Sequence, residues 1–376
     1  MGRKMIIMND IVKLNPTVCI VRNKYQIMII SEQEALISVR VGNRVYYNHS
    51  NGIRVSSPGV HRISVPAEEL DKARKYTVVV EKMIERKPYF SETEAPIEKT
   101  YIFRPVEKTD DINIYHLADV HGQFSQAVNI AKCCGKEIDL LIMNGDISST
   151  SDTFDDIILC YKIASEVTKG EFPCIISRGN HDLRGLEAQN LAKYMPGDNE
   201  KSYYTFKTGC IWGMLVDTGE DKDDNNPAYG GTICCHDFRL EQENMIKNTI
   251  ENAFDEYDQE GVKYKLIISH VPFTFKRENP FDIERQLYSD WSELIKKNIN
   301  PDIMLCGHTH KACISECGSE YDDLGQPCTI IVGSDVAEEN GENATLAGAL
   351  ITLNDGRARV KVNSENGILF EETVCF

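Results

Sequence analysis

Residues 112–121 read INIYHLADVH, an apolar run that ends in an aspartate and a histidine. The segment that follows, residues 124–134, has the apolar spacing of a helix. From here onward, apolar runs alternate with amphipathic segments of helix length, and this alternation predicts an α/β fold with a layered sheet. Ligands of such sheets bind beyond the carboxyl ends of the strands, so the residues at those ends are the first candidates for function.

Metal-capable side chains stand at the ends of five predicted strands. Five of the nine histidines lie there, whereas chance would scatter them along the chain. The five sites are Asp119-Val120-His121, Asn144-Gly145-Asp146, Gly179-Asn180-His181-Asp182, His270 and the CGHTH stretch at 306–310, which contains His308 and His310.

Carboxylate, imidazole and amide groups together suit borderline divalent metals. The set is too large for one tetrahedral site, and it fits two metals that share a bridging carboxylate about 3.5–4 Å apart. Each residue alone also has an ordinary structural interpretation: Asp119 and Asp146 as helix N-caps, and Asn180 as a turn residue. The combination favours the metal site.

The order of these five motifs resembles that of the calcineurin-like metallophosphoesterases over roughly residues 112–350. The motifs are DVH, NGD, GNHD, His270 and GHTH. The resemblance implies a four-layered α/β/β/α sandwich, two metal ions (Mn, Fe or Zn) and a metal-bridging hydroxide as the nucleophile. It assigns one metal to Asp119, His121, Asp146 and His310, with Asp146 bridging, and the other to Asn180, His270 and His308.

The resemblance also implies roles around the substrate. His181 is the expected acid that contacts phosphate and protonates the leaving oxygen. Asp182 either orients His181 or caps the next helix. Asn180, His181 and Arg184 are the expected substrate contacts. Among the basic residues, Arg184, Lys276 and Arg277 could each contact phosphate, with ordinary solvated charge as the alternative.

Two departures from the family's patterns are visible. Many members read GDxxDR, with an aspartate that orients the catalytic histidine, but residues 145–150 read GDISST. Asp152 and Asp182 are the candidates to replace that aspartate. Purple acid phosphatases have Asp-x-Gly at the first motif and a tyrosine where this chain has Ser149, so we expect no iron–tyrosinate colour here.

The first hundred residues have a different pattern. Short β-rich runs are separated by turn signals such as SNG and SPG, which predicts an antiparallel β-sandwich. It resembles the fibronectin type III-like domain that precedes the catalytic domain of purple acid phosphatases. We therefore expect a β-sandwich over 1–108 and a catalytic domain over 109–376, joined by the charged segment 104–111.

Composition limits the partners and the compartment. The net charge of −17 opposes binding to long nucleic acid or to anionic membranes, so a small phosphorylated substrate is expected. No apolar run approaches the roughly 18 residues of a membrane helix, and no secretory signal is apparent. Thirteen scattered cysteines favour free thiols and a cytoplasmic location. The oligomeric state stays open.

These observations favour a metal-dependent phosphoester hydrolase, with a phosphatase as the first interpretation. A phosphodiesterase that acts on nucleotides or other small diesters is the first alternative. A noncatalytic scaffold that keeps the fold is the second alternative, and lost ligand positions would indicate it. Here every expected ligand position is filled.

Overall fold

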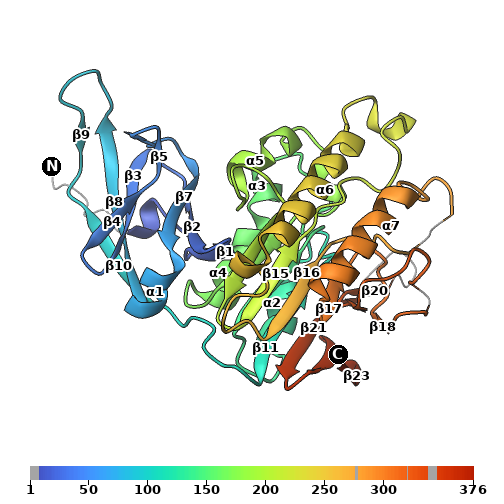
Figure 1. Cartoon of the computed structure of the whole chain (residues 1–376). Coiled ribbons are helices and arrows are strands. Elements are labelled where there is room, and N and C mark those ends of the chain that lie inside the picture. The colour runs from blue at the N-terminus through green and yellow to red at the C-terminus, as the bar shows by residue number, and fades with distance from the viewer. Residues whose placement is uncertain (1–7, 276–277, 320, 338–344) are drawn as a thin grey trace.

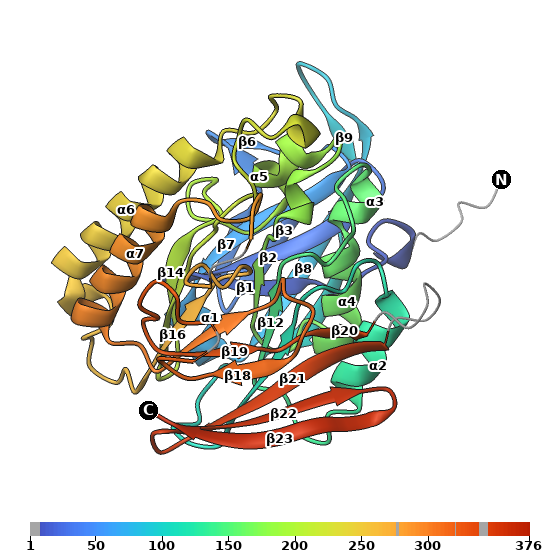
Figure 2. The same cartoon turned by 90° about the vertical axis from the view of Figure 1, so that its right-hand side faces the viewer.

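The computed structural model describes residues 8–275, 278–319, 321–337 and 345–376. Lys276 and Arg277, two of the basic candidates, lie outside the described residues. Two β-sheets pack face to face, and helices cover the outer face of each sheet (Figures 1 and 2). The predicted four-layered α/β/β/α architecture and the N-terminal β region are therefore confirmed.

The first sheet contains ten strands within the described residues and runs in the order β23-β22-β21-β11-β12-β13-β1-β2-β7, with β20 beside β21. Its central strands β11, β12 and β13 are parallel. The strands are β1 (Thr17–Val21), β2 (Lys24–Ser31), β7 (Gly59–Pro66), β11 (Ile112–Leu117), β12 (Leu140–Asn144), β13 (Cys174–Ser177), β20 (Asp335–Ala337), β21 (Thr345–Asn354), β22 (Arg357–Ser364) and β23 (Gly367–Cys375).

The second sheet runs in the order β14-β15-β16-β17-β19-β18. Strands β15, β16, β17 and β19 are parallel, while β14 and β18 pair antiparallel at the two edges. The strands are β14 (Tyr204–Thr208), β15 (Ile211–Leu215), β16 (Tyr264–Ile268), β17 (Ile303–Cys306), β18 (Cys313–Ser315) and β19 (Thr329–Val332).

The apolar runs are continuous because both faces of the central strands are buried. In β12, Leu140 and Ile142 face the second sheet and share a core with Leu266 and Leu305. Met143 points the other way, into the core beneath the outer helices. The period-2 alternation of side chains thus supplies both cores from one strand.

Helices α2 (Phe124–Lys132) and α4 (Leu159–Thr168) cover the first sheet, and α6 (Cys235–Glu251) and α7 (Arg285–Leu294) cover the second (Figure 2). Shorter helices are α3 (Phe154–Ile157) and α5 (Leu191–Tyr194), with single turns at η1 (Met8–Asp10), η2 (His181–Leu183), η3 (Ala188–Asn190), η4 (Pro227–Tyr229), η5 (Ala253–Asp255) and η6 (Ile295–Ile299). Throughout the described ranges, every helix is too short or too polar to cross a membrane.

The N-terminal region forms a sandwich from two layers. One layer is a separate antiparallel sheet in the order β10-β8-β3-β4, with β9 beside β8. Its strands are β3 (Ala35–Val41), β4 (Arg44–Tyr47), β8 (Lys75–Glu85), β9 (Glu92–Thr93) and β10 (Ile97–Ile102), and the short strands β5 (His49–Ser50) and β6 (Ile53–Arg54) and helix α1 (Ala67–Ala73) complete the region.

The other layer consists of β1, β2 and β7, and these strands extend the first sheet of the catalytic region. Strand β1 pairs parallel with β13, with Cys19 opposite Cys174. Ile27 of β2 shares one core with Val39 of β3 and with Ile142 of β12. The two regions therefore share a sheet and a core, a connection that strand spacing did not predict. The residue boundary at 108/109 stays a prediction.

Candidate metal centre

The loops that follow β11, β12, β13, β16 and β17 bring the predicted ligands together. Among the described residues, two groups of three side chains place their ligand atoms within 4.8 Å of one another. The first group is Asp119, His121 and His310, and the second is Asp146, His270 and His308. All six residues were predicted as metal ligands from the sequence.

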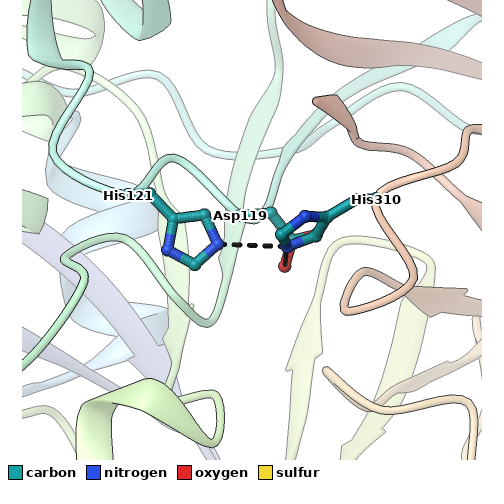
Figure 3. Close-up of side chains that lie close together, drawn as sticks. All are labelled: Asp119, His121 and His310. Carbon is teal, nitrogen blue, oxygen red and sulfur yellow. Dashed lines mark hydrogen bonds and ion pairs between the residues drawn. The ribbon is translucent and has the colours of Figure 1, made fainter. Parts of the chain in front are cut away.

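In the first group, Nε2 of His121 and Nε2 of His310 lie 3.1 Å apart (Figure 3). Oδ1 of Asp119 lies 3.5 Å from the same nitrogen of His310. Two nitrogens bound to one ion at about 2.1 Å, with angles of roughly 90–109°, stand about 3.0–3.4 Å apart. These side chains therefore have the spacing of ligands to a common cation.

In the second group, Nε2 of His270 lies 3.1 Å from Oδ2 of Asp146. Nδ1 of His308 faces Oδ1 of Asn180 at 3.0 Å. The Asn180 amide also fits in a flipped orientation, in which its nitrogen faces His308 and its oxygen accepts from Nη2 of Arg184 at 2.9 Å. A cation at this point favours the first orientation, because it needs the lone pairs of both residues.

The two groups lie next to each other. Nε2 of His270, in the second group, is 3.7 Å from Oδ1 of Asp119, in the first. Asp146 accepts a hydrogen bond from the backbone N–H of His181 at 2.9 Å, which fixes its carboxylate. Neither Asp119 nor Asp146 caps a helix, because Gln123 precedes α2 and Thr153 caps α3 with its side chain.

Further hydrogen bonds orient the ligands. Nδ1 of His270 lies 2.7 Å from the carbonyl of Asn144, which places the ring hydrogen on Nδ1 and leaves Nε2 to face Asp146. The carboxylate of Asp119 accepts from the backbone N–H of His308 and from the hydroxyl of Ser334. Such outer partners fix the direction of each ligand lone pair.

The backbone at the ligands is strained. Positive φ angles, which are uncommon for residues other than glycine, occur at five of the predicted ligands: Asp119, His121, Asp146, His308 and His310. Strain of this kind concentrates at functional sites. At Gly179, a Cβ atom would stand 2.2 Å from Oδ1 of Asp146, so only glycine lets the two loops approach this closely.

In both ligand groups, the charges of neighbouring side chains oppose the effect of burial on the pKa values. Burial by itself raises the pKa of the Asp119 carboxyl, but hydrogen bonding and charge from His310 and His270 lower that pKa below its usual range. Burial disfavours a charged His270, yet Asp146 and Asp119 raise the pKa of its imidazole to about 10. The carboxylates thus attract cations in a buried place, which is the condition for metal binding.

These observations together test the fit of a metal. Ligand atoms face one another at 3.0–3.1 Å in three pairs: His121 with His310, His270 with Asp146, and His308 with Asn180. Such pairs need a proton or a cation between them. The residues present therefore fit bound divalent metal.

His181 lies beside the two groups on η2. Its Nδ1 is 3.0 Å from the carbonyl of Ser149, and its Nε2 is 3.2 Å from Nη1 of Arg184. The His181 ring thus has a backbone carbonyl as its partner at Nδ1. The carboxylate of Asp152 instead accepts from Thr150 and from the backbone of Leu186.

The structure gives Asp182 a different role from the two that were expected. Its Oδ2 accepts hydrogen bonds from the backbone N–H groups of Gly179, at 2.6 Å, and Asp146, at 3.0 Å. Burial and the charge of Asp146 raise the pKa of this carboxyl to about 7. Asp182 thus neither orients the His181 ring nor caps a helix, but ties the GNHD loop to the NGD loop.

Arg184 is at the site, but its guanidinium is already paired. Two nitrogens of Arg184 bind the buried carboxylate of Glu220 at 2.7 and 2.8 Å. The hydroxyl of Tyr229 donates to the same carboxylate at 2.9 Å, and Asp221 lies 3.5 Å from Arg184. No local signal in the sequence singled out Glu220 or Asp221.

Comparisons with known proteins agree with this geometry. The family model described as "Calcineurin-like phosphoesterase" matches residues 112–312. Comparison with curated proteins gave no match. Among solved structures, a purple acid phosphatase from yellow lupin (Lupinus luteus) seeds is similar with a TM-score of 0.63 and 14% identity, over 96% of this chain and 74% of that one.

A structure of PhoD is similar with a TM-score of 0.56 and 10% identity, over 100% of this chain and 90% of that one. At these identities, the two likenesses show a shared fold. They cover the N-terminal β region as well as the two-sheet region.

Proposed function

The chain belongs to the calcineurin-like phosphoesterase family of metal-dependent phosphoester hydrolases, and from this premise we propose that it holds two metal ions and hydrolyses a small phosphorylated substrate. The observation that carries the proposal is the division of the ligands into two adjacent groups of three. Asp119, His121 and His310 would hold one ion. Asp146, His270, His308 and Asn180 would hold the other, and Asp146 is proposed to serve both.

When bound, such ions supply charge to stabilise phosphoryl oxygens and lower the pKa of water. The residues of the chain contribute orientation. Asn144 and Ser334 fix ligand directions by hydrogen bonds, and Asp182 holds the two loops that carry Asp146 and Asn180.

His181 is proposed as the acid for the leaving oxygen. Its Nδ1 is engaged by the carbonyl of Ser149, so the proton for the leaving oxygen would come from Nε2, the nitrogen that faces Nη1 of Arg184. Arg184 lies against this nitrogen and beside Asn180, and a substrate phosphate at this point would meet a guanidinium already oriented by Glu220.

The substrate is proposed to be a monoester, with a small diester as the alternative. Long nucleic acid is disfavoured because the chain carries 58 acidic against 41 basic residues. A noncatalytic scaffold is disfavoured because all seven predicted ligands are present and oriented toward one another.

The proposal also covers the identity of the metals and the cellular location of the protein. Mixed oxygen and nitrogen ligands suit Mn, Fe and Zn comparably. We propose that the protein lies in the cytoplasm, on the strength of the thirteen cysteines scattered along its chain. They include Cys19 and Cys174, whose sulfurs lie 3.6 Å apart.

The deciding experiment strips the protein of metal, adds Mn²⁺, Zn²⁺ or Fe²⁺ stepwise, and measures hydrolysis of para-nitrophenyl phosphate and of its bis-ester. Asp146→Asn and His181→Ala are the test variants. Asp152→Asn, at an exposed carboxylate outside the ligand groups, and His49→Ala, at an exposed histidine of β5, are the matched controls.

We expect metal-dependent turnover that falls by at least about a hundredfold in both test variants and persists in both controls. The ratio of the two rates identifies a monoesterase or a diesterase. Two bound metals per chain without turnover of either ester would favour the scaffold. A chain that binds no metal would refute the proposed centre.

A further inference from the structure

A groove of about 780 Å³ begins beside the proposed metal centre. Residues 183–189 form one wall and residues 228–238 form the other, and we call it the Leu186 groove. The first wall continues directly from η2, which begins with His181. Arg184 lines the groove and also lies 3.2 Å from Nε2 of His181. A leaving group beside His181 would therefore have Arg184, and the groove that Arg184 lines, next to it.

The lining of the groove is mainly apolar. Leu183, Leu186, Tyr229, Ile233 and Phe238 contribute side chains from both walls. Leu186 is 78% exposed, so it contributes little to the core of the protein and presents its side chain to the groove's opening. Single exposed leucines are ordinary, but here the exposed leucine belongs to an apolar surface next to the proposed reaction site.

The cations of the groove are neutralised. Arg184 binds Glu220 through two hydrogen bonds, and Arg178 forms an ion pair with the buried carboxylate of Asp217. Both arginines line the groove, so its wall offers no surplus of positive charge to a second anionic group. A nucleoside polyphosphate or a sugar bisphosphate would leave such a group without a partner.

Larger grooves lie elsewhere. One of about 980 Å³ runs between Leu14 and Phe154, and one of about 910 Å³ lies around Arg22 and Trp212. Their linings contain neither a predicted metal ligand nor Arg184. The Leu186 groove is smaller and its lining also lacks the predicted ligands, but it contains Arg184, the residue that contacts His181.

We propose that the Leu186 groove binds the uncharged, largely apolar alcohol part of the phosphate ester, such as an aryl group. This rests on the proposed function, because it takes His181 as the neighbour of the leaving oxygen. The ester bond lies at the mouth of the groove, the phosphate lies toward the ligand groups, and the apolar part lies between Leu186 and Phe238.

The test compares two pairs of compounds. Phosphate release is measured from 2-naphthyl phosphate and from methyl phosphate. Binding is measured by calorimetry with the non-hydrolysable naphthylmethylphosphonate and methylphosphonate. The test variants are Leu186→Ser, which removes apolar surface, and Ala228→Trp, which adds bulk at an exposed position of the opposite wall. Leu240→Ser is the matched control, at a leucine that is 40% exposed on α6 and outside the groove.

We expect the wild-type protein to bind the naphthyl phosphonate at least tenfold more tightly than the methyl one. This preference should fall about fivefold in Leu186→Ser, the size expected for one partly buried apolar side chain. Ala228→Trp should also lower the preference for the naphthyl phosphonate, and Leu240→Ser should keep the wild-type preference. Melting temperatures confirm that each variant is folded.

Three results would overturn the inference. An unchanged naphthyl preference in both test variants refutes the groove while the phosphoesterase stands. A wild-type protein that hydrolyses both esters but has no naphthyl preference also refutes the groove alone. Failure of the wild-type protein to hydrolyse either ester with any metal removes the proposed function, and the groove's role with it.

Discussion

Glu220 is the residue whose importance was least visible in the sequence. Its carboxylate is fully buried and receives hydrogen bonds from Arg184 and Tyr229. Its backbone carbonyl accepts from Nη2 of the buried Arg239 at 2.6 Å. Glu220 thus connects the loop after β15 to the arginine that contacts His181, and we regard it as a positioning residue.

Glu220→Gln is expected to impair catalysis more than folding. Glutamine keeps one acceptor oxygen but loses the charge that holds Arg184 in a two-bond fork. We expect kcat to fall about tenfold or more, with a smaller change in KM, and Glu220→Asp to recover part of kcat. Steady-state kinetics and thermal unfolding measure both effects, and Glu166→Gln on the surface of α4 is the control. Equal losses of activity and stability would indicate a purely structural role.

His61 makes stability depend on pH away from the metal centre. This residue of β7 is fully buried, and burial lowers the pKa of its imidazole to about 4, from about 6.5 in an unfolded chain. Between these values the unfolded chain binds a proton that the folded protein excludes. Stability is therefore complete above about pH 6.5 and declines as the pH falls toward 4, by roughly 3 kcal/mol at most.

His61→Leu should remove this pH-dependent contribution to the free energy of unfolding. We expect the difference in unfolding free energy between pH 7 and pH 5, measured with urea, to be smaller in the variant than in the wild type. The comparison between two pH values cancels the change in packing caused by leucine. His49→Leu, at an exposed position of β5, should keep the wild-type difference. An equal pH difference in wild type and His61→Leu would contradict the prediction.

At the scale of elements, the site is made by loops that follow parallel strands. The glycine of GNHD is essential to this arrangement, because a Cβ at Gly179 would collide with Asp146 at both Oδ1, 2.2 Å away, and the backbone nitrogen, 2.8 Å away. Both of these atoms belong to Asp146, in the loop after β12. The two loops reach their close approach only without a side chain at this position.

Gly179→Ala is expected to displace the Asp146 carboxylate and weaken metal binding. We expect fewer metal ions bound per chain, measured by elemental analysis after dialysis, and a loss of activity at limiting metal. Gly52→Ala is the control, since nothing lies within 4 Å of its Cβ position and its positive φ carries only the backbone cost of about 1–2 kcal/mol. Full metal content in Gly179→Ala would show that the loops can adjust.

At the scale of the whole molecule, the N-terminal region and the catalytic region should unfold together. They share a sheet through β1 and β13 and a core through Ile27, Val39 and Ile142. Both tryptophans, Trp212 of β15 and Trp291 of α7, are buried in the second sheet and its helices. Tryptophan fluorescence therefore reports unfolding of the second sheet and its helices.

Ile27→Ala tests this cooperation. The side chain is fully buried in β2, and its truncation should cost about 2–5 kcal/mol. We expect the tryptophan transition to move to a lower temperature together with far-ultraviolet circular dichroism. Ile53→Ala, at a side chain that is 63% exposed, should leave both transitions in place. A fluorescence transition that stays while circular dichroism shows an earlier phase would show that the regions unfold separately.

The sequence pattern was sufficient to predict the α/β class and the seven candidate ligands, and the resemblance to the calcineurin-like metallophosphoesterases implied the four layers. Continuous apolar runs such as LLIM at 140–143 encode buried strands locally, and the motif residues stand directly after them. Parallel strands bring their carboxyl ends to one edge, so topology alone gathers these residues. The paired geometry of His121 with His310 and of His308 with Asn180 agrees with that expectation.

Only the tertiary structure decided which partners orient the ligands and what surrounds them. The carbonyl of Asn144 lies 126 residues from His270 in sequence, and Ser334 lies 215 residues from Asp119. The pair of Arg184 with Glu220 and the sheet shared by β1 and β13 also join distant segments. No local pattern encodes such contacts, because they depend on how two sheets and their loops pack. Residue types and their order along the chain therefore determined the chemistry, and packing decided its orientation.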